Sequence, residues 1–210
     1  MLKVLKNIVL QDRLTRIRKD GLKSAYFRDL MAEIGSLIGY EFASTMEIRS
    51  VTLKTPLGTA KGIKIKDLDD VVVVSVLRAA IPMVDGIMKV FSEARYGMAG
   101  AWREDEPPFE VEVSYIKIPD VNDKIVIVAD PMLATGNTMN ATLKKIKDQG
   151  KPRRLAIFNI IATEEGIEKV LENHSEVEIY TCSIENELKD GYIVPGLGDA
   201  GDIAFGRPSD

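Results

Sequence analysis

The sequence contains very little cysteine and histidine. Among its 210 residues there is one cysteine, Cys182, and one histidine, His174. A single cysteine excludes an intrachain disulfide, and it fits a reducing compartment. A single histidine excludes a multi-histidine metal site and argues against a histidine-dependent nucleophile. We therefore expect Cys182 to pack in the core, and His174 to cap a helix or face solvent.

Long apolar runs and a strong net charge are also absent. No window approaches the roughly 20 apolar residues of a membrane span, and the first twenty residues lack the apolar core and cleavage site of a signal peptide. The net charge of -4 gives no general attraction to nucleic acid or to an anionic membrane. We expect a cytoplasmic protein with a single globular domain spanning residues 1–210.

Short buried-type strands alternate with helical segments through most of the chain. Residues 71–77, VVVVSVL, are β-branched and apolar on both faces, which is typical of a strand in a parallel sheet. Further strands are expected at 125–129, 154–162 and 177–184, and helices at 10–45, from residue 80, from 137 to Gly150, and at 163–174. This alternation predicts an α/β fold with a mostly parallel sheet flanked by helices.

Two segments depart from the alternation. Residues 46–65 alternate apolar with polar side chains across a Pro-Leu-Gly turn, which predicts an exposed hairpin or edge strands. Residues 101–120 combine a charged, proline-containing stretch with the alternating FEVEVSYIKI, which predicts a β-arm with a mobile tip. Apolar side chains spaced by three and four in the first helical segment predict a stripe that faces the core or a partner subunit: Leu22, Tyr26, Leu30, Ile34, Leu37 and Tyr40.

One strand ends on an aspartate followed by a loop of small and hydroxyl residues, IVIVADPMLATGNTM. Ligands of open α/β sheets bind beyond the carboxyl ends of the strands, and a helix N-terminus suits a phosphate. Gly136 permits close approach of the backbone, Thr135 and Thr138 add hydroxyl donors, and Asp130 can accept hydrogen bonds from a sugar diol. Neither a Walker loop nor G-x-G-x-x-G is present. The alternative is an ordinary strand–turn–helix capped by Asn137 or Thr138.

Four motifs together resemble one family. ADPMLATGNT resembles the phosphoribosyl-diphosphate (PRPP) motif of type I phosphoribosyltransferases, and its DPMLATG part resembles the uracil phosphoribosyltransferase branch. GYIVPGLGDAGDIAFG (191–206) resembles that branch's uracil-binding tail, VLRAAIPMVDG (76–86) resembles its pyrophosphate loop, and EIGSLIGYE resembles an N-terminal segment. The resemblance covers most of the chain in the family's order. It implies a type I phosphoribosyltransferase fold with a β-arm at about 96–120 and a hood segment at about 185–210.

The resemblance assigns site residues to the matching positions. It implies catalytic roles for Asp130, Arg103 and Asp199, and it assigns no residue to a metal. PRPP would be bound by Arg78, Arg103, Asp130, Pro131, Met132, Leu133, Ala134, Thr135, Gly136, Asn137, Thr138 and Asp199. Uracil would be bound by Ile193, Gly198, Asp199 and Ala200.

Two of these assignments have a plainer alternative. The residues RAAIPM stand where the family usually has RAGLGM, and Arg78 would otherwise be a surface arginine paired at a helix start. Arg103 lies beside three acids, Glu104, Asp105 and Glu106, so it would otherwise belong to a solvated charge cluster.

The tail GLGDAGD exposes backbone, because it has three glycines and no bulky side chain. A backbone N–H that faces O4 of uracil would reject cytosine, whose amino group there is a donor. An unpaired buried polar group costs on the order of 1–3 kcal/mol. The alternative is a glycine-rich turn packed on the core.

The resemblance implies the reaction of uracil with PRPP to give UMP and diphosphate, in pyrimidine salvage. It also implies Mg²⁺ held mainly by PRPP and water, a homodimer or homotetramer built on the N-terminal helices, and activation by GTP in some relatives, for which no residue can be assigned.

Two other functions stay open. A nucleotide-sensing regulator of RNA or DNA would need a basic face, and the acidic chain offers only the clusters RLTRIRK and KPRRL. A transferase for another base would not need the glycine-rich tail.

Overall fold

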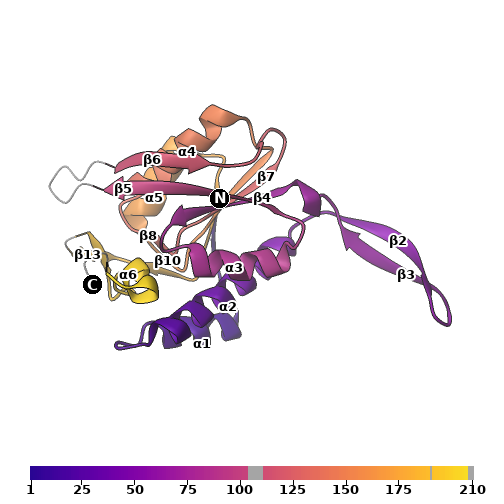
Figure 1. Ribbon diagram of the computed structural model, residues 1–210, viewed down its shortest axis with the longest axis horizontal. Helices are drawn as coiled ribbons and strands as arrows, with labels where there is room; N and C mark the ends of the chain where they lie inside the picture. Colours follow the sequence, from indigo (N-terminus) through magenta and orange to yellow (C-terminus); the bar gives the residue numbers. More distant parts are fainter. Residues whose placement is uncertain (104–110, 190, 208–210) are drawn as a thin grey trace.

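The computed structural model describes residues 1–103, 111–189 and 191–207, with the backbone alone at Trp102 and Arg103. Its centre is a seven-stranded sheet in the order β1-β11-β9-β7-β4-β5-β6. Figure 1 labels its strands β4, β5, β6 and β7. All neighbouring pairs are parallel except β5 and β6. The strands of this sheet are β1 (Leu2–Val4), β4 (Val71–Leu77), β5 (Arg95–Arg103), β6 (Val111–Lys117), β7 (Ile125–Ala129), β9 (Arg154–Phe158) and β11 (Glu178–Thr181).

Helices cover both faces of the sheet (Figure 1). The helices are α1 (Ile8–Ile17), α2 (Ser24–Ala43), α3 (Ile81–Val90), α4 (Asn137–Gln149), α5 (Glu164–Asn173) and α6 (Ala200–Phe205), with a short 3-10 turn η1 (Leu68–Asp70) before β4. Val71 and Val73 pack with α1, α2 and α3 on one face, while Val72 and Val74 pack with α4 and α5 on the other. The two-sided burial of β4 explains its unbroken apolar sequence, and it confirms the predicted α/β fold.

Three strands bend at their carboxyl ends and continue into a second small sheet. This parallel sheet has the order β12-β10-β8 and is built from β8 (Met132–Leu133), β10 (Ile161–Thr163) and β12 (Ser183–Glu185). Backbone hydrogen bonds cross the bends, with the N–H groups of Ile160 and Ile161 donating to Pro131 O at 2.9 and 3.1 Å. The predictions of unbroken strands at 154–162 and 177–184 are therefore wrong at one point each, since both strands bend.

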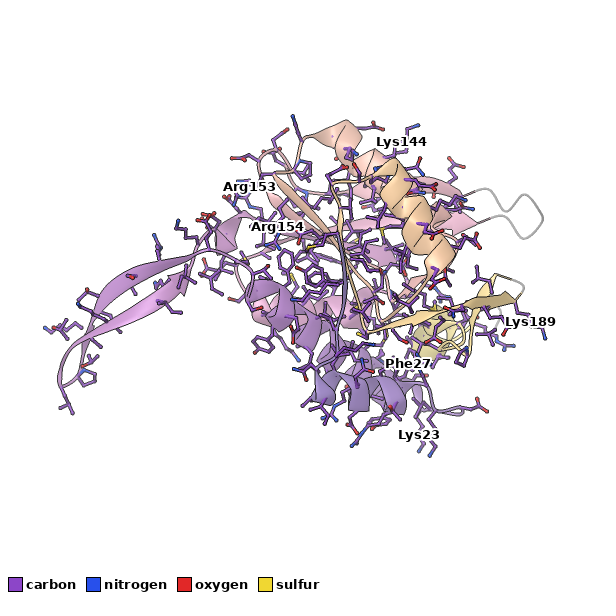
Figure 2. All side chains as sticks on the ribbon, turned by 180° about the vertical axis from the view of Figure 1, so that it is seen from behind. Lys23, Phe27, Lys144, Arg153, Arg154 and Lys189 are labelled. Atoms are coloured by element: carbon purple, nitrogen blue, oxygen red, sulfur yellow. The ribbon has the colours of Figure 1, made fainter. Side chains whose placement is uncertain are left out.

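The two predicted hairpins are present. β2 (Ile48–Thr55) and β3 (Gly58–Ile65) pair antiparallel and project far from the body of the molecule, as Figures 1 and 2 show. The predicted β-arm corresponds to the antiparallel pair β5 and β6, although residues 104–110 lie outside the described part. A further hairpin, β13 (Glu187–Lys189) and β14 (Tyr192–Val194), precedes α6. Among the described residues, no helix is both long and apolar enough to cross a membrane.

The predicted apolar stripe of α2 belongs mainly to the core. Leu30 and Ile34 are fully buried, but Tyr26 and Tyr40 at its edges are exposed. The buried face is centred instead on other members of the same helix, with Phe27, Leu30, Met31, Ile34, Ile38 and Phe42 all at 2% exposure or less. The core therefore takes up most of the stripe, which is the first of the two alternatives that the spacing predicts.

Helices α2 and α3 cross at glycine contacts. A Cβ atom on Gly86 would lie 1.8 Å from Ala32 O, and one on Gly35 would lie 2.1 Å from Met83 O. The hydroxyl of Ser36 donates to Gly86 O at 2.9 Å across the same contact. Because α3 follows the loop that carries Arg78, this close crossing fixes the position of that loop.

A Gly86→Ala substitution is expected to lower the free energy of unfolding by about 3 kcal/mol, because the new methyl group must push the two helix backbones apart. The measurement is chemical denaturation of the variant and the parent. Gly39→Ala, in the same pair of helices, is the matched control, since its Cβ would meet only side-chain atoms of Val90 and Phe91 at 3.2 Å or more. Equal stabilities for the two variants would contradict the described crossing.

Candidate active site

Three motifs that are far apart in the sequence meet at the carboxyl ends of the parallel strands. Arg78 directly follows β4, Asp130 directly follows β7, and Asp199 is the N-cap residue of α6. Together with Thr138 they line a cavity of about 250 Å³. The structure thus brings the predicted phosphate-loop, arginine and tail residues to one place.

Asp130 lies at the bend between β7 and β8. Its backbone is fixed on both sides, since its N–H donates to Phe158 O at 3.1 Å and its carbonyl accepts from the buried Asn159 side chain at 2.6 Å. Its Oδ1 accepts the N–H of Met132 at 3.2 Å. Burial raises the pKa of Asp130 to about 7, against the opposing effect of the Met132 hydrogen bond. The carboxyl group is therefore held in one place and changes charge near neutral pH.

The phosphate loop, residues 130–138, leads into the N-terminus of α4. Gly136 is the N-cap residue in a left-handed conformation with φ 76°, and within the described structure no side chain caps this helix. The alternative of a cap by Asn137 or Thr138 is therefore wrong, because both residues lie inside the helix. A small cavity of about 60 Å³ is lined by Asp130, Met132, Leu133, Ala134, Thr135, Gly136, Thr138 and Met139. Uncapped N–H groups at such a helix end attract an anion.

The start of α5 supports this loop from behind. The hydroxyl of Thr163 donates to Ala134 O at 2.6 Å and accepts the N–H of Gly166 at 2.9 Å. A Cβ atom on Gly166 would lie 2.2 Å from Ala134 O, so only glycine fits there. Sequence reasoning missed both residues. The one signal was a threonine three residues before a glycine at a helix start.

The hood segment contributes backbone to the site. Gly196 and Gly198 have φ of 61° and 72°, the left-handed region that glycine adopts readily. Ile193, Gly198, Asp199 and other residues of the hood line a cavity of about 660 Å³, and Ala200 is fully buried next to it. The alternative for the tail also holds in part, because Leu197, Ala200 and Ala204 belong to the hydrophobic core.

Arg78 is ion-paired as well as placed at the cavity. Its Nη2 lies 2.9 Å from Asp202 Oδ1, and its Nη1 donates to Gly206 O at 3.2 Å. The alternative of a paired arginine next to a helix start is therefore confirmed, whereas binding of diphosphate by Arg78 stays a prediction. Its side chain lines the site, and it is held there by residues of the hood. Arg103 ends β5, but its side chain and the neighbouring Glu104, Asp105 and Glu106 lie outside the described part of the structure.

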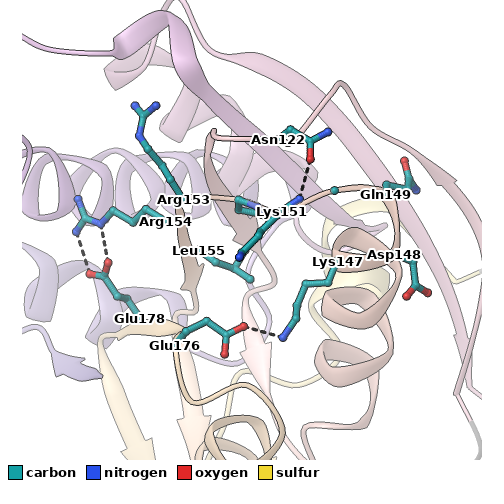
Figure 3. A pocket seen from close by; sticks show the side chains of 12 residues that line it. Asn122, Lys147, Asp148, Gln149, Lys151, Arg153, Arg154, Leu155, Glu176 and Glu178 are labelled. Atoms are coloured by element: carbon teal, nitrogen blue, oxygen red, sulfur yellow. Dashed lines mark hydrogen bonds and ion pairs between the residues drawn. The ribbon is translucent and has the colours of Figure 1, made fainter.

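A larger cavity of about 730 Å³ lies at the other end of the sheet, where β9 begins (Figure 3). Four of its charged side chains form two ion pairs, with Lys147 Nζ 2.7 Å from Glu176 Oε1 and Arg154 Nε 2.6 Å from Glu178 Oε1 (Figure 3). It contains none of the motif residues. Size therefore does not identify the functional site in this fold, and the convergence of motifs does.

The remaining reactive side chains stand apart from the site. Cys182 is buried, as predicted, and burial raises the pKa of its thiol. His174 does end α5, but its side chain is buried beside Lys147 Nζ at 3.0 Å and does not face solvent. Burial lowers the pKa of His174, and the nearby ammonium of Lys147 lowers it further.

Known proteins match the whole chain. The family model for uracil phosphoribosyltransferase matches residues 4–207. A uracil phosphoribosyltransferase from Methanothermobacter thermautotrophicus is 51% identical over 100% of this chain and 97% of its own length. One from Pyrococcus furiosus is 45% identical over 95% of this chain and 87% of its own length.

Solved structures agree with these matches. The AQ2163 protein from Aquifex aeolicus superposes with a TM-score of 0.92 at 28% identity, covering 98% of both chains. A hypoxanthine phosphoribosyltransferase from Staphylococcus aureus superposes with a TM-score of 0.52 at 13% identity over 87% of this chain and 84% of that one, a likeness of fold alone. The convergent motifs, the fold and the full-length matches lead to one conclusion: the chain belongs to the uracil phosphoribosyltransferase family.

Proposed function

We propose that this protein transfers the 5-phosphoribosyl group of PRPP to N1 of uracil, giving UMP and diphosphate. The observation that carries the proposal is the single cavity lined by Arg78, Asp130, Thr138 and Asp199. It joins an arginine for the diphosphate, an acid for the ribose and a phosphate loop to a hood that exposes backbone. No other cavity found in the described structure combines these groups.

PRPP is proposed to lie along the carboxyl edge of the sheet. Its 5′-phosphate would bind the N–H groups and hydroxyls of residues 135–138, at the uncapped start of α4. The ribose diol would donate to the carboxylate of Asp130, and the diphosphate would bind Arg78. The two cavities that hold these groups share Asp130, Met132 and Thr138, so one extended ligand can occupy both.

In the proposed reaction the bond between N1 and C1′ forms while the bond between C1′ and the diphosphate oxygen breaks. The electron pair of the broken bond leaves with diphosphate, and positive charge develops at C1′. The chain's work is to position the two substrates and to stabilise that charge, to which the carboxylate of Asp130 contributes. N1 of uracil loses its proton, and Asp199, at the junction of cavity and hood, is the candidate acceptor among the described residues.

Mg²⁺ is proposed as the cofactor, bound mainly through PRPP and water. Within the described residues no group of three or more histidine, cysteine or acidic side chains is placed to hold a metal. The acids that line the cavity can supply one or two oxygen ligands, and this suits a cation that usually keeps several waters. When bound, Mg²⁺ would neutralise charge on the departing diphosphate.

Selectivity for uracil is proposed to come from the backbone of the hood. Gly198 and Ala200 stand on either side of Asp199 without bulky side chains, and Gly198, which has a left-handed backbone, lines the hood cavity with Asp199. A backbone N–H fixed opposite position 4 of the base can donate to O4 of uracil. The same N–H would face the amino group of cytosine, which is also a donor, so no hydrogen bond would form. Arg103 is proposed to cover the diphosphate and to exclude water.

A homodimer or homotetramer is also proposed, with activation by GTP and a role in pyrimidine salvage as expectations from family resemblance. The projecting β2–β3 hairpin supports oligomerisation, because Leu57 at its tip is fully exposed and Ile63 is 66% exposed. Residues 48–65 of the hairpin include four basic side chains and no acidic one, whereas the whole chain has a net charge of -4. Light scattering of the purified protein measures the mass of the oligomer. Adding GTP to the assay of pyrophosphate release tests whether GTP activates the protein.

The function is tested by release of pyrophosphate from PRPP and Mg²⁺ with uracil, cytosine, orotate, hypoxanthine or no base. We expect uracil-dependent release and at least tenfold less with cytosine, the discrimination that one mispaired buried group supplies. Turnover with another base would keep the PRPP site and overturn the role of the hood. Binding of PRPP or UMP without turnover of any base would favour a nucleotide-sensing regulator.

A further inference from the structure

The hood and the loop after β4 are tied together by one charged contact. Arg78 donates to Asp202 Oδ1 at 2.9 Å and to the carbonyl of Gly206 at 3.2 Å. Asp202 is itself fixed, because its N–H donates to Asp199 Oδ1 at 2.9 Å. A chain of hydrogen bonds therefore runs from the acid that caps α6, through Asp202, to the arginine of the diphosphate site.

We propose that Asp202 is a positioning residue that holds Arg78 in the geometry in which it binds the diphosphate of PRPP. The proposal rests on the proposed function, since it concerns the same diphosphate site. Asp202 is placed for such a role, because it lines the PRPP cavity, the hood cavity and a third cavity between the hood and the end of α1. Of these three cavities, Arg78 lines only the PRPP cavity.

Arg78 can bind an anion while it keeps its contacts with Asp202 and Gly206. A guanidinium group has five N–H donors, and the contacts to Asp202 and Gly206 use two of them. Three donors remain for diphosphate oxygens. The side chain of Arg78 is 44% exposed and that of Asp202 is 28% exposed, so this pair adds little to stability, and its effect is to restrict the rotamers of a long side chain.

A competing role predicts the opposite result. Asp202 could occupy Arg78 in the absence of PRPP and have to be displaced, in which case its removal would strengthen PRPP binding. We favour positioning because one of the two acceptors, the carbonyl of Gly206, is neutral. The other is anchored through the backbone of a helix whose N-cap residue, Asp199, lines the same cavity. Both acceptors belong to the hood, so the contact also joins the uracil-binding tail to the PRPP site.

The test is a steady-state comparison of Asp202→Ala and Asp202→Asn with the parent. We expect Asp202→Ala to raise KM for PRPP about tenfold, equivalent to about 1.4 kcal/mol, with kcat changed less than twofold. Asp202→Asn keeps an oxygen acceptor for Arg78 and is expected to recover most of the parent's KM. Glu187→Ala is the matched control, since this exposed acid of the same hood is not one of the residues lining the three cavities.

A double-mutant cycle separates positioning from a merely structural effect. In an Arg78→Ala background, removal of Asp202 is expected to leave KM for PRPP unchanged, because no arginine remains to be positioned. An equal rise in both backgrounds, no rise in either, or a fall in KM with Asp202→Ala would each overturn the proposal. If the parent turns over no base, the proposed function fails. Calorimetric titration with PRPP then makes the same comparison on binding alone.

Discussion

An Asp130→Asn variant is expected to lose uracil-dependent pyrophosphate release by about 10²- to 10³-fold, the loss typical of removing one electrostatic contact to a transition state. The amide removes the negative charge beside the ribose, where positive charge develops at C1′. It also replaces one acceptor of the diol by a donor. The backbone around residue 130 is held by Phe158 and Asn159, so the substitution should change the chemistry with little change of position.

The measurement is kcat/KM for PRPP at saturating uracil. Asp29→Asn, an exposed acid of α2, serves as the matched control and is expected to match the parent. An Asp130→Asn variant with parental kcat/KM would remove this residue from the mechanism and leave the phosphate loop as the only argued contact to PRPP at that strand end.

The same variant is expected to gain stability at alkaline pH. The folded pKa of Asp130, about 7, lies above its ordinary value of 3.8, so the folded protein binds the extra proton between these values. Stability that is present below pH 4 is therefore lost as pH rises to 7 and above. The difference between the folded and the ordinary pKa of Asp130 corresponds to about 4 kcal/mol, which we reduce to about 2 kcal/mol because Asp130 is only partly buried.

Thermal unfolding of both proteins at pH 5 and pH 8 checks this result. Asparagine at position 130 should raise the melting temperature more at pH 8 than at pH 5. An equal rise in melting temperature at pH 5 and at pH 8 would show that burial of the charged carboxylate at position 130 does not lower stability. Activity of the parent should likewise increase as pH rises through about 7, since the carboxylate form accepts both ribose hydroxyls.

A Gly166→Ala variant is expected to lower kcat/KM for PRPP about 10²-fold, the cost of displacing a binding group by about 1 Å. Its Cβ would lie 2.2 Å from Ala134 O and 3.0 Å from Leu133 O, so the phosphate loop must move away. Alanine is the better helix former, and in open space it would stabilise α5. The direction of the effect therefore tests the contact between α5 and the loop.

Steady-state kinetics and denaturation of Gly166→Ala are compared with those of Gly39→Ala, another helical glycine, whose Cβ would meet side chains at 3.2 Å or more. The control is expected to keep parental kcat/KM. Parental kinetics for Gly166→Ala would mean that the loop adapts without cost, and they would remove α5 from the account of the site.

Much of the fold was predictable because its strands are buried on both faces. The apolar runs at 71–77 and 125–129 identified β4 and β7, and the residues that follow them, Arg78 and Asp130, both line the cavity. The rule that ligands bind at the carboxyl ends of parallel strands needs no knowledge of side-chain contacts. Motifs placed on those ends could therefore be assembled from sequence.

What the sequence did not predict depends on contacts between distant segments. The bends that carry β9 and β11 into a second sheet were not predicted, because apolar residues stand on both sides of each bend and RLAIFNIIA and VEIYTCSI are each typical of one continuous strand. The support of the loop by Gly166 and the pairing of Arg78 with Asp202 join residues about 30 and more than 120 positions apart. Such contacts follow from packing and are absent from any local pattern.

The most direct test of the central claim is conversion of labelled uracil to UMP by the purified protein with PRPP and Mg²⁺, measured beside Asp130→Asn. We expect labelled UMP in amounts that depend on PRPP, with the rate reduced about 10²- to 10³-fold in the variant. Absence of labelled UMP from the parent protein, under conditions in which PRPP binds, would contradict this claim.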